Sequence, residues 1–120
     1  MKWDFDLLRL ILLDIQNMPV GTICSAFTFT EQYDPVTVSE HVRLLIAEGL
    51  INGKMTTVRG AIDKFTITGL TWKGQDFVDV AKDNSIWAKV KRKSLISTTR
   101  ITYDLVLEWL KIEAKGKKPK

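Results

Sequence analysis

The change of hydrophobic period within residues 64–81 constrains the fold most. Phe65 and Ile67 alternate with polar neighbours, which predicts a strand with one buried face. From Thr71 onward the apolar positions follow helical spacing, and the threonine can cap the first turn of this helix. The sequence therefore predicts that a strand runs directly into a helix, as in an α+β fold.

Gly74 stands inside the predicted helix, where glycine costs about 1 kcal/mol relative to alanine. It falls on the inward face with Val78 and Ala81, so the missing side chain would let the helix backbone press closely against the strands. Trp72, at the first helical position, is expected to cover the end of the strands. We rank these packing roles ahead of ligand contacts, because buried aromatic residues are mostly core residues.

Apolar stripes predict further helices along the chain, giving helices near 4–17, 37–48, 71–82, 85–94 and 99–114. A β-hairpin is expected across about 51–68, with Arg59-Gly60 as its turn and Asn52-Gly53 as the competing turn. The alternation of Phe27 and Phe29 with threonine predicts a short strand or extended segment between the first two helices.

The helix ends carry recognisable capping signals. Asp4 or Asp6 can cap the first helix, and Thr37 with Glu40 has the spacing of a capping box. Gly49 suits the left-handed stop of the second helix. Further along, Asn84 or Ser85 is expected to cap the fourth helix. The last helix is expected to present one apolar stripe made of Ile101, Leu105, Trp109 and Ile112.

The predicted core combines the apolar stripes of the helices with the inward positions of the hairpin. It consists of Leu7, Ile11, Val42, Leu45, Ile46, Leu50, Phe65, Ile67, Leu70 and Phe77.

The charge is unevenly distributed over the 120 residues, whose net charge is +4. Residues 1–81 hold 7 Lys+Arg and 10 Asp+Glu, whereas residues 82–120 hold 11 Lys+Arg and 4 Asp+Glu. A lysine-rich end attracts nucleic acid or acidic proteins, although a solvated end is the commoner role. The basic tail consists of Lys115, Lys117, Lys118 and Lys120, within a segment 115–120 that is expected to be disordered.

Several classes of protein are disfavoured. Cys24 is the only cysteine, so no internal disulfide can form. The apolar run 7–15 is too short to span a bilayer, and we expect a cytoplasmic protein without a membrane segment. His41 and Cys24 are too few for a metal site, no cofactor motif occurs, and we expect a packed, hydrogen-bonded histidine rather than a catalytic one. A binding protein is favoured over an enzyme.

The order helix, short strand, helix, hairpin, helix is that of a winged helix-turn-helix core with additional C-terminal helices. The stretches "HVRLLIAEGLI" and "FTITGLTWKGQDF" resemble the junctions on either side of the wing in such proteins. We expect an α+β, mostly helical chain with a winged-helix-like domain at 1–97 and a C-terminal helix at 98–114.

Three stretches resemble the domain of unknown function family 2513, whose members are short bacterial and phage proteins. They are "MKWDFDLLRLILLDI", "EHVRLLIAEGLI" and "GLTWKGQDFVDVAKDNSIWAKVK", and the resemblance covers residues 1 to about 93. It implies a winged-helix-like fold and a frequent phage or prophage origin, and it implies no activity.

Two functions follow from this fold. In a DNA-binding regulator the second helix would enter the major groove and the hairpin would contact phosphate. The residues expected to contact DNA are Thr37, Ser39, Glu40, Arg43, Lys54, Arg59 and Lys64. The alternative is a phage-encoded factor that binds a host or defence protein. It is favoured by the weak charge of this surface, which is −1 over 36–48 and +2 over 52–64. A dimer could form through the C-terminal helix.

Overall fold

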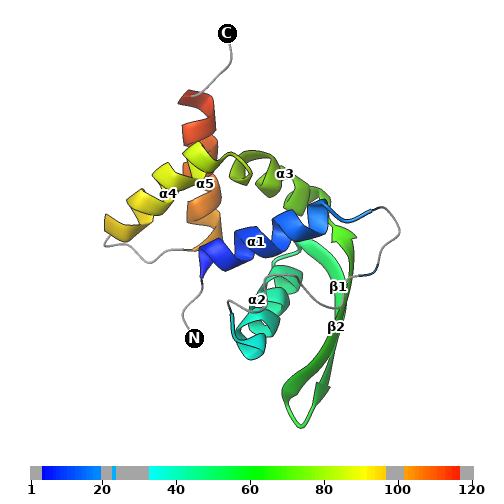
Figure 1. The fold of residues 1–120 in the computed structure, drawn as a ribbon. Coiled ribbons are helices and arrows are strands. Elements are labelled where there is room, and N and C mark those ends of the chain that lie inside the picture. The colour runs from blue at the N-terminus through cyan, green and yellow to red at the C-terminus, as the bar shows by residue number, and fades with distance from the viewer. Residues whose placement is uncertain (1–3, 20–22, 24–32, 97–101, 117–120) are drawn as a thin grey trace. The chain divides into compact units, whose positions relative to one another are not determined.

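The computed structural model describes residues 4–19, 23, 33–96 and 102–116. Within these ranges the chain is α+β and mostly helical, with five helices and one antiparallel hairpin in the order α1, α2, β1, β2, α3, α4, α5 (Figure 1). The chain forms two compact units, Met1–Gln75 and Asp76–Lys120, which we describe separately. The division into domains at 97/98 and the winged-helix arrangement stay predictions.

Helix α1 spans Phe5–Gln16 and packs on α2 and on strand β2. Asp4 caps it, because its carboxylate accepts a hydrogen bond from the backbone N–H of Leu7 at 3.1 Å, as expected for one of the two candidate caps. Its buried stripe is formed by Leu7, Leu8, Ile11, Leu12 and Ile15. Asp14 is half-buried, and desolvation by burial raises the pKa of its carboxyl above the ordinary value.

Helix α2 spans Pro35–Ala47, so it begins two residues before the predicted start at Thr37. The capping box expected for Thr37 and Glu40 is wrong. Asp34 is the cap, because its carboxylate accepts from the backbone N–H of Thr37 and Pro35 occupies the first turn, where the missing N–H costs nothing. The helix ends as predicted, since Gly49 has a φ of +76°.

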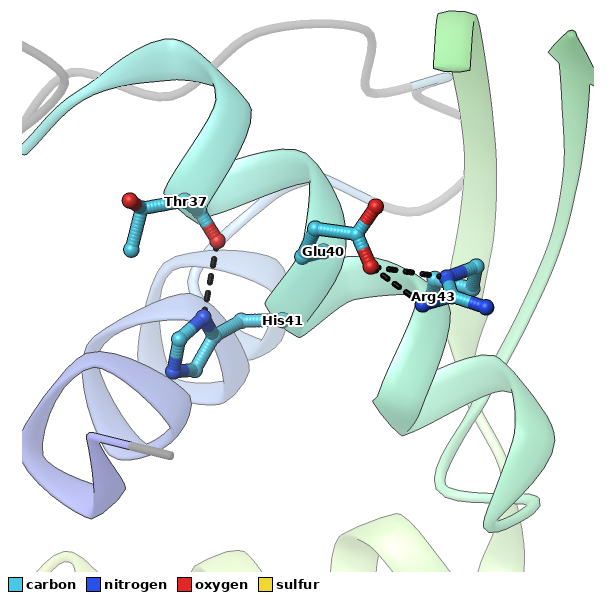
Figure 2. Close-up of polar contacts among 4 residues, drawn as sticks. All are labelled: Thr37, Glu40, His41 and Arg43. Carbon is cyan, nitrogen blue, oxygen red and sulfur yellow. Dashed lines mark hydrogen bonds and ion pairs between the residues drawn. The ribbon is translucent and has the colours of Figure 1, made fainter. Parts of the chain in front are cut away.

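His41 holds α1 and α2 together. The side chain is 0% exposed, its Nε2 accepts from the backbone N–H of Asp4 at 2.9 Å, and its Nδ1 contacts the carbonyl of Thr37 at 2.7 Å (Figure 2). Since Nε2 is the acceptor, Nδ1 carries the proton and donates to the carbonyl. The prediction of a packed, hydrogen-bonded histidine is confirmed.

Strands β1, Ile51–Val58, and β2, Ala61–Leu70, form the predicted hairpin. The turn lies at Arg59-Gly60, where φ is +54° and +81°, the pattern of a type I′ turn. The competing turn at Asn52-Gly53 is wrong, because both residues lie in β1 beside an irregularity in the register. Met55 pairs with Phe65 and both are half-buried, which places one face of the hairpin toward α2 and α1.

The C-terminal end of α2, the start of β1 and the start of α3, Trp72–Ala81, meet at one junction. Thr71 caps α3 as predicted, because its Oγ1 accepts from the N–H of Gly74 at 3.0 Å. The same hydroxyl donates to the carbonyl of Gly49 at 2.5 Å, and the Thr71 N–H donates to the carbonyl of Leu50 at 3.1 Å. A Cβ on Gly74 would overlap the Leu50 carbonyl oxygen and lie 3.0 Å from its carbon, which confirms the close approach inferred from the sequence.

Trp72 does not cover the end of the hairpin, and that prediction is wrong. Its side chain is 93% exposed. The position next to the cap points outward, because Gly74 occupies the position on α3 that meets Leu50, directly before the hairpin.

The second unit contains α4, Asn84–Ile96, and α5, Tyr103–Gly116, which pack on each other. Asp83 rather than Asn84 or Ser85 caps α4, since its carboxylate accepts from the N–H groups of Ser85 and Ile86 at 2.9 and 3.1 Å. Helix α5 begins at Tyr103, later than the predicted residue 99. The hydroxyl of Thr102 caps this start, because it accepts a hydrogen bond from the backbone N–H of Leu105.

The buried stripe of α5 is not the predicted one. Val106 and Leu110 are buried, whereas Leu105 and Trp109 are half-buried and Ile112 is 51% exposed.

Ile101 and the strand expected at Phe27 and Phe29 lie outside the described residues. Of the predicted core, Leu7, Ile11, Val42, Leu45, Leu50, Ile67 and Phe77 are buried, and Ile46, Phe65 and Leu70 are half-buried.

The junction predicts the effect of adding one methyl group. Gly74→Ala should destabilise the protein by about 1–3 kcal/mol, since the overlap with the Leu50 carbonyl outweighs the roughly 1 kcal/mol gained in helix propensity. Gly69→Ala is the matched control, because a Cβ there meets nothing within 4 Å. Urea unfolding measures both changes, and a Gly74→Ala protein more stable than wild type would contradict this packing.

The buried histidine predicts a second effect on stability. His41→Phe keeps a flat ring but leaves the Asp4 N–H without an acceptor, so the free energy of unfolding should fall by about 1–3 kcal/mol. Lys54→Ala, on the exposed face of the hairpin, is the control. If His41→Phe lowers stability no more than this control, the link between α1 and α2 is not stabilising.

Candidate nucleic-acid interface

The outward face of α2 carries the residues expected to read bases. Arg43 is the most accessible, with its side chain 61% exposed, whereas Ser39 and Glu40 are half-buried. In Figure 2 Arg43 and His41 point to different sides of α2, so the packing of the histidine against α1 leaves the arginine free to face outward. Of the predicted base-reading residues, Arg43 is the one best placed to reach a ligand.

Arg43 is paired within the helix. Its Nε and Nη2 both donate to the Oε2 of Glu40, three residues earlier, and the Nε distance is 3.0 Å (Figure 2). The pair neutralises the only cation of α2, as the charge count of this stretch indicated. An exposed pair of this kind contributes about 0.3–0.5 kcal/mol, so a stronger partner can displace it.

The N-terminus of α2 carries further negative charge. The Thr37 hydroxyl lies 3.5 Å from the carboxylate of Asp34, the residue that caps the helix. The Thr37 hydroxyl thus lies beside a fixed anion. The sequence signal that identifies this cap is the Asp-Pro pair, since proline favours the first helical position directly after a capping residue.

The hairpin carries three exposed cations, Lys54, Arg59 and Lys64. Lys54 pairs with Thr66 and Lys64 with Thr56, so both lysines lie on the same face, opposite that of Met55 and Phe65. None of the three has an acidic partner among the residues that the structure describes. The structure therefore gathers two predicted phosphate contacts on one face of the hairpin and places the third at its tip.

Arg59 occupies the left-handed region, with a φ of +54°. This conformation costs a residue with a side chain about 1–2 kcal/mol, and asparagine or glycine is the usual choice in a type I′ turn. An arginine at the tip is unfavourable for the turn itself. Such an outlier points to a role for the side chain.

The C-terminal cations are only partly described. Lys115 is exposed and helical, within α5, whereas Lys117, Lys118 and Lys120 lie outside the described residues. Within the second unit, helix α4 carries exposed cations that were not among the predicted contacts, namely Lys89, Lys91 and Arg92. Lys89 lies 3.9 Å from Glu113 on α5, so its charge is partly compensated within the second unit.

The described residues contain no group of three or more His, Cys, Asp or Glu side chains able to hold a metal ion. Among the same residues, no helix has the length and apolar character needed to cross a membrane.

Comparison with known proteins identifies the family. A protein of Haemophilus influenzae described as "Uncharacterized protein" is 28% identical over 96 residues, which is 76% of each chain. No solved structure matches the chain. The family model described as "Hypothetical protein (DUF2513)" matches residues 2–99, and the chain belongs to this family, as its sequence motifs indicated.

Proposed function

We propose that the chain is a non-enzymatic, cytoplasmic DNA-binding regulator of phage or prophage origin with a winged helix-turn-helix arrangement. In this proposal α2 enters the major groove and Arg43 reaches a base edge, while the hairpin contacts the backbone as the wing. The order α1, α2, β1, β2 within the first unit supports this arrangement.

The observation that carries the proposal is the arginine at the tip of the hairpin. A type I′ turn with an exposed Arg59 at φ +54° is less stable than the same turn with asparagine. A cation at the end of a projecting hairpin can reach a phosphate or the minor groove, and phosphate contacts supply much of DNA affinity. Lys54 and Lys64 add two charges to the same hairpin.

The pair between Arg43 and Glu40 does not prevent base contact. Separating an exposed ion pair costs about 0.3–0.5 kcal/mol, whereas a bidentate contact between arginine and guanine contributes about 1–3 kcal/mol. The base contact therefore outweighs the pair. Without DNA, Glu40 holds the arginine side chain at the surface of α2.

A specific observation favours the alternative, a factor that binds a host or defence protein. Trp72 is 93% exposed at the start of α3, and tryptophan is enriched at the centres of protein–protein interfaces. The near-neutral face of α2 fits a protein partner better than it fits DNA. This function would use Trp72, which the DNA-binding proposal leaves unused.

Salt-titrated binding to duplex DNA separates the two functions. Arg59→Ala should weaken binding to all sequences alike and reduce the salt slope by about one unit. Arg43→Ala should cost about 1–3 kcal/mol on a specific site and relax its sequence preference. Full-length protein and a version ending at Ala114 are measured beside them, so that the contribution of the tail is known.

Trp72→Ala is the matched control for this assay, since it removes an exposed side chain outside the proposed contacts. DNA binding that depends only on the tail, with no effect of Arg43→Ala or Arg59→Ala, contradicts the regulator and favours a protein partner. Capture of a host protein by wild type but not by Trp72→Ala would then support the alternative.

A substitution at the tip should separate stability from binding. Arg59→Asn places the preferred residue in the type I′ turn, so the free energy of unfolding should rise by about 0.5–1 kcal/mol while DNA affinity falls. Unfolding in urea and binding at low salt are measured on the same sample. An Arg59→Asn protein that is more stable and binds DNA as well as wild type shows that the arginine has no part in binding.

A further inference from the structure

Helix α5 carries two apolar stripes, of which only one is buried. Val106 and Leu110 form the buried stripe. Leu105 and Trp109 are half-buried and Ile112 is 51% exposed, and these three fall within about 60° of the helix circumference. The second stripe is thus an apolar surface on the outside of the second unit.

A row of four exposed charges runs beside this second stripe, at spacings of four, three and four residues. The row is acidic in its N-terminal half and basic in its C-terminal half, and consists of Asp104, Glu108, Lys111 and Lys115. None of the four has an ion-pair partner among the described residues. All four lie within about 60° of one another around the helix, so they form one ridge.

We propose that this face of α5 binds α5 of a second copy of the chain in an antiparallel arrangement. A two-fold axis beside residues 109 and 110 places Asp104 opposite Lys115 and Glu108 opposite Lys111, because both pairs of positions are centred on the same point. The symmetry repeats each pair, so every charge in the ridge finds an opposite charge. The second apolar stripes of the two copies then meet beside this charged ridge.

The order of charges along the ridge favours a second copy of α5 as the partner, and favours its antiparallel orientation. A parallel second copy would set acid against acid and base against base, which is unfavourable. Only a partner whose charges run in the reverse order matches the ridge, and an antiparallel copy of α5 has that order by symmetry. This inference concerns the second unit and does not depend on DNA binding by the first.

The contact of Lys93 with Trp109 fits the same interface. The Lys93 Nζ lies 5.5 Å from the centre of the Trp109 ring, a cation–π contact within one copy. Such a contact strengthens when water is removed from around it. A second copy packed on Trp109 would remove that water while leaving the contact inside each protomer intact.

Complementary charge reversal tests the proposal on the full-length protein. Sedimentation velocity at low salt should show wild type associating to a dimer as its concentration rises. The double variant Lys111→Glu/Lys115→Glu and the double variant Asp104→Lys/Glu108→Lys should each weaken association roughly tenfold or more. Mixing the two variants in equal amounts should restore a dimer, because each then meets opposite charges.

Lys54→Glu/Lys64→Glu on the hairpin makes the same change in net charge as Lys111→Glu/Lys115→Glu and should leave association unchanged. Circular dichroism of each variant confirms that it is folded, and Ile112→Asp, at an exposed position, provides an independent test of the apolar stripe. A wild type that stays monomeric at its highest soluble concentration overturns the proposal. So does a dimer that neither the charge reversals nor Ile112→Asp weakens.

Discussion

The contact between the backbone of Gly74 and the carbonyl of Leu50 is the constraint on which the first unit depends. At this point α2 has just ended, β1 is beginning and α3 starts, so three elements share a few residues. The Thr71 side chain and backbone bond to Gly49 and Leu50, and the Lys73 ammonium donates to the carbonyl of Glu48 at 2.9 Å. These bonds satisfy the carbonyls of the three residues that directly follow α2. No side chain fits between the two backbones, and the glycine follows from that.

A second constraint acts on the other side of α2. His41 binds the backbone at the start of α1, so α2 is held by the junction at its C-terminal end and by the histidine at its midpoint. Polar groups remain accessible on its outward face and on the hairpin, at the tip among other places. Arg43 and Arg59 lie in these two places. The candidate interface thus consists of what the packing of α2 and the hairpin leaves exposed.

Local signals predicted most of the fold. Periodicity found the helices and the hairpin. Gly49, Arg59-Gly60 and the Thr71 cap are correct because each depends on residues close in sequence. Gly74 is correct for another reason, since a glycine on the inward face of a helix indicates a close approach of two backbones. The errors at the helix caps lie where two local signals compete. Asp34 competes with Thr37 for the cap of α2, and the carboxylate beside Pro35 determines the start.

Other features depend on tertiary packing and could not be read from the sequence. The two apolar stripes of α5 are equivalent by pattern, and only its contact with α4 selects Val106 and Leu110 for burial. In the candidate site, the exposed positions of Lys54, Arg59 and Lys64 follow from strand alternation and the turn. The pairing of Arg43 with Glu40 depends instead on rotamers that spacing alone does not fix.

Because Ile51 pairs with Leu70 at the base of the hairpin, the chain leaves the junction and returns to it at the same place. The hairpin can therefore lengthen or shorten by two residues in each strand without exchanging its two faces and without moving the start of α3. The length of the hairpin can thus evolve separately from the helices.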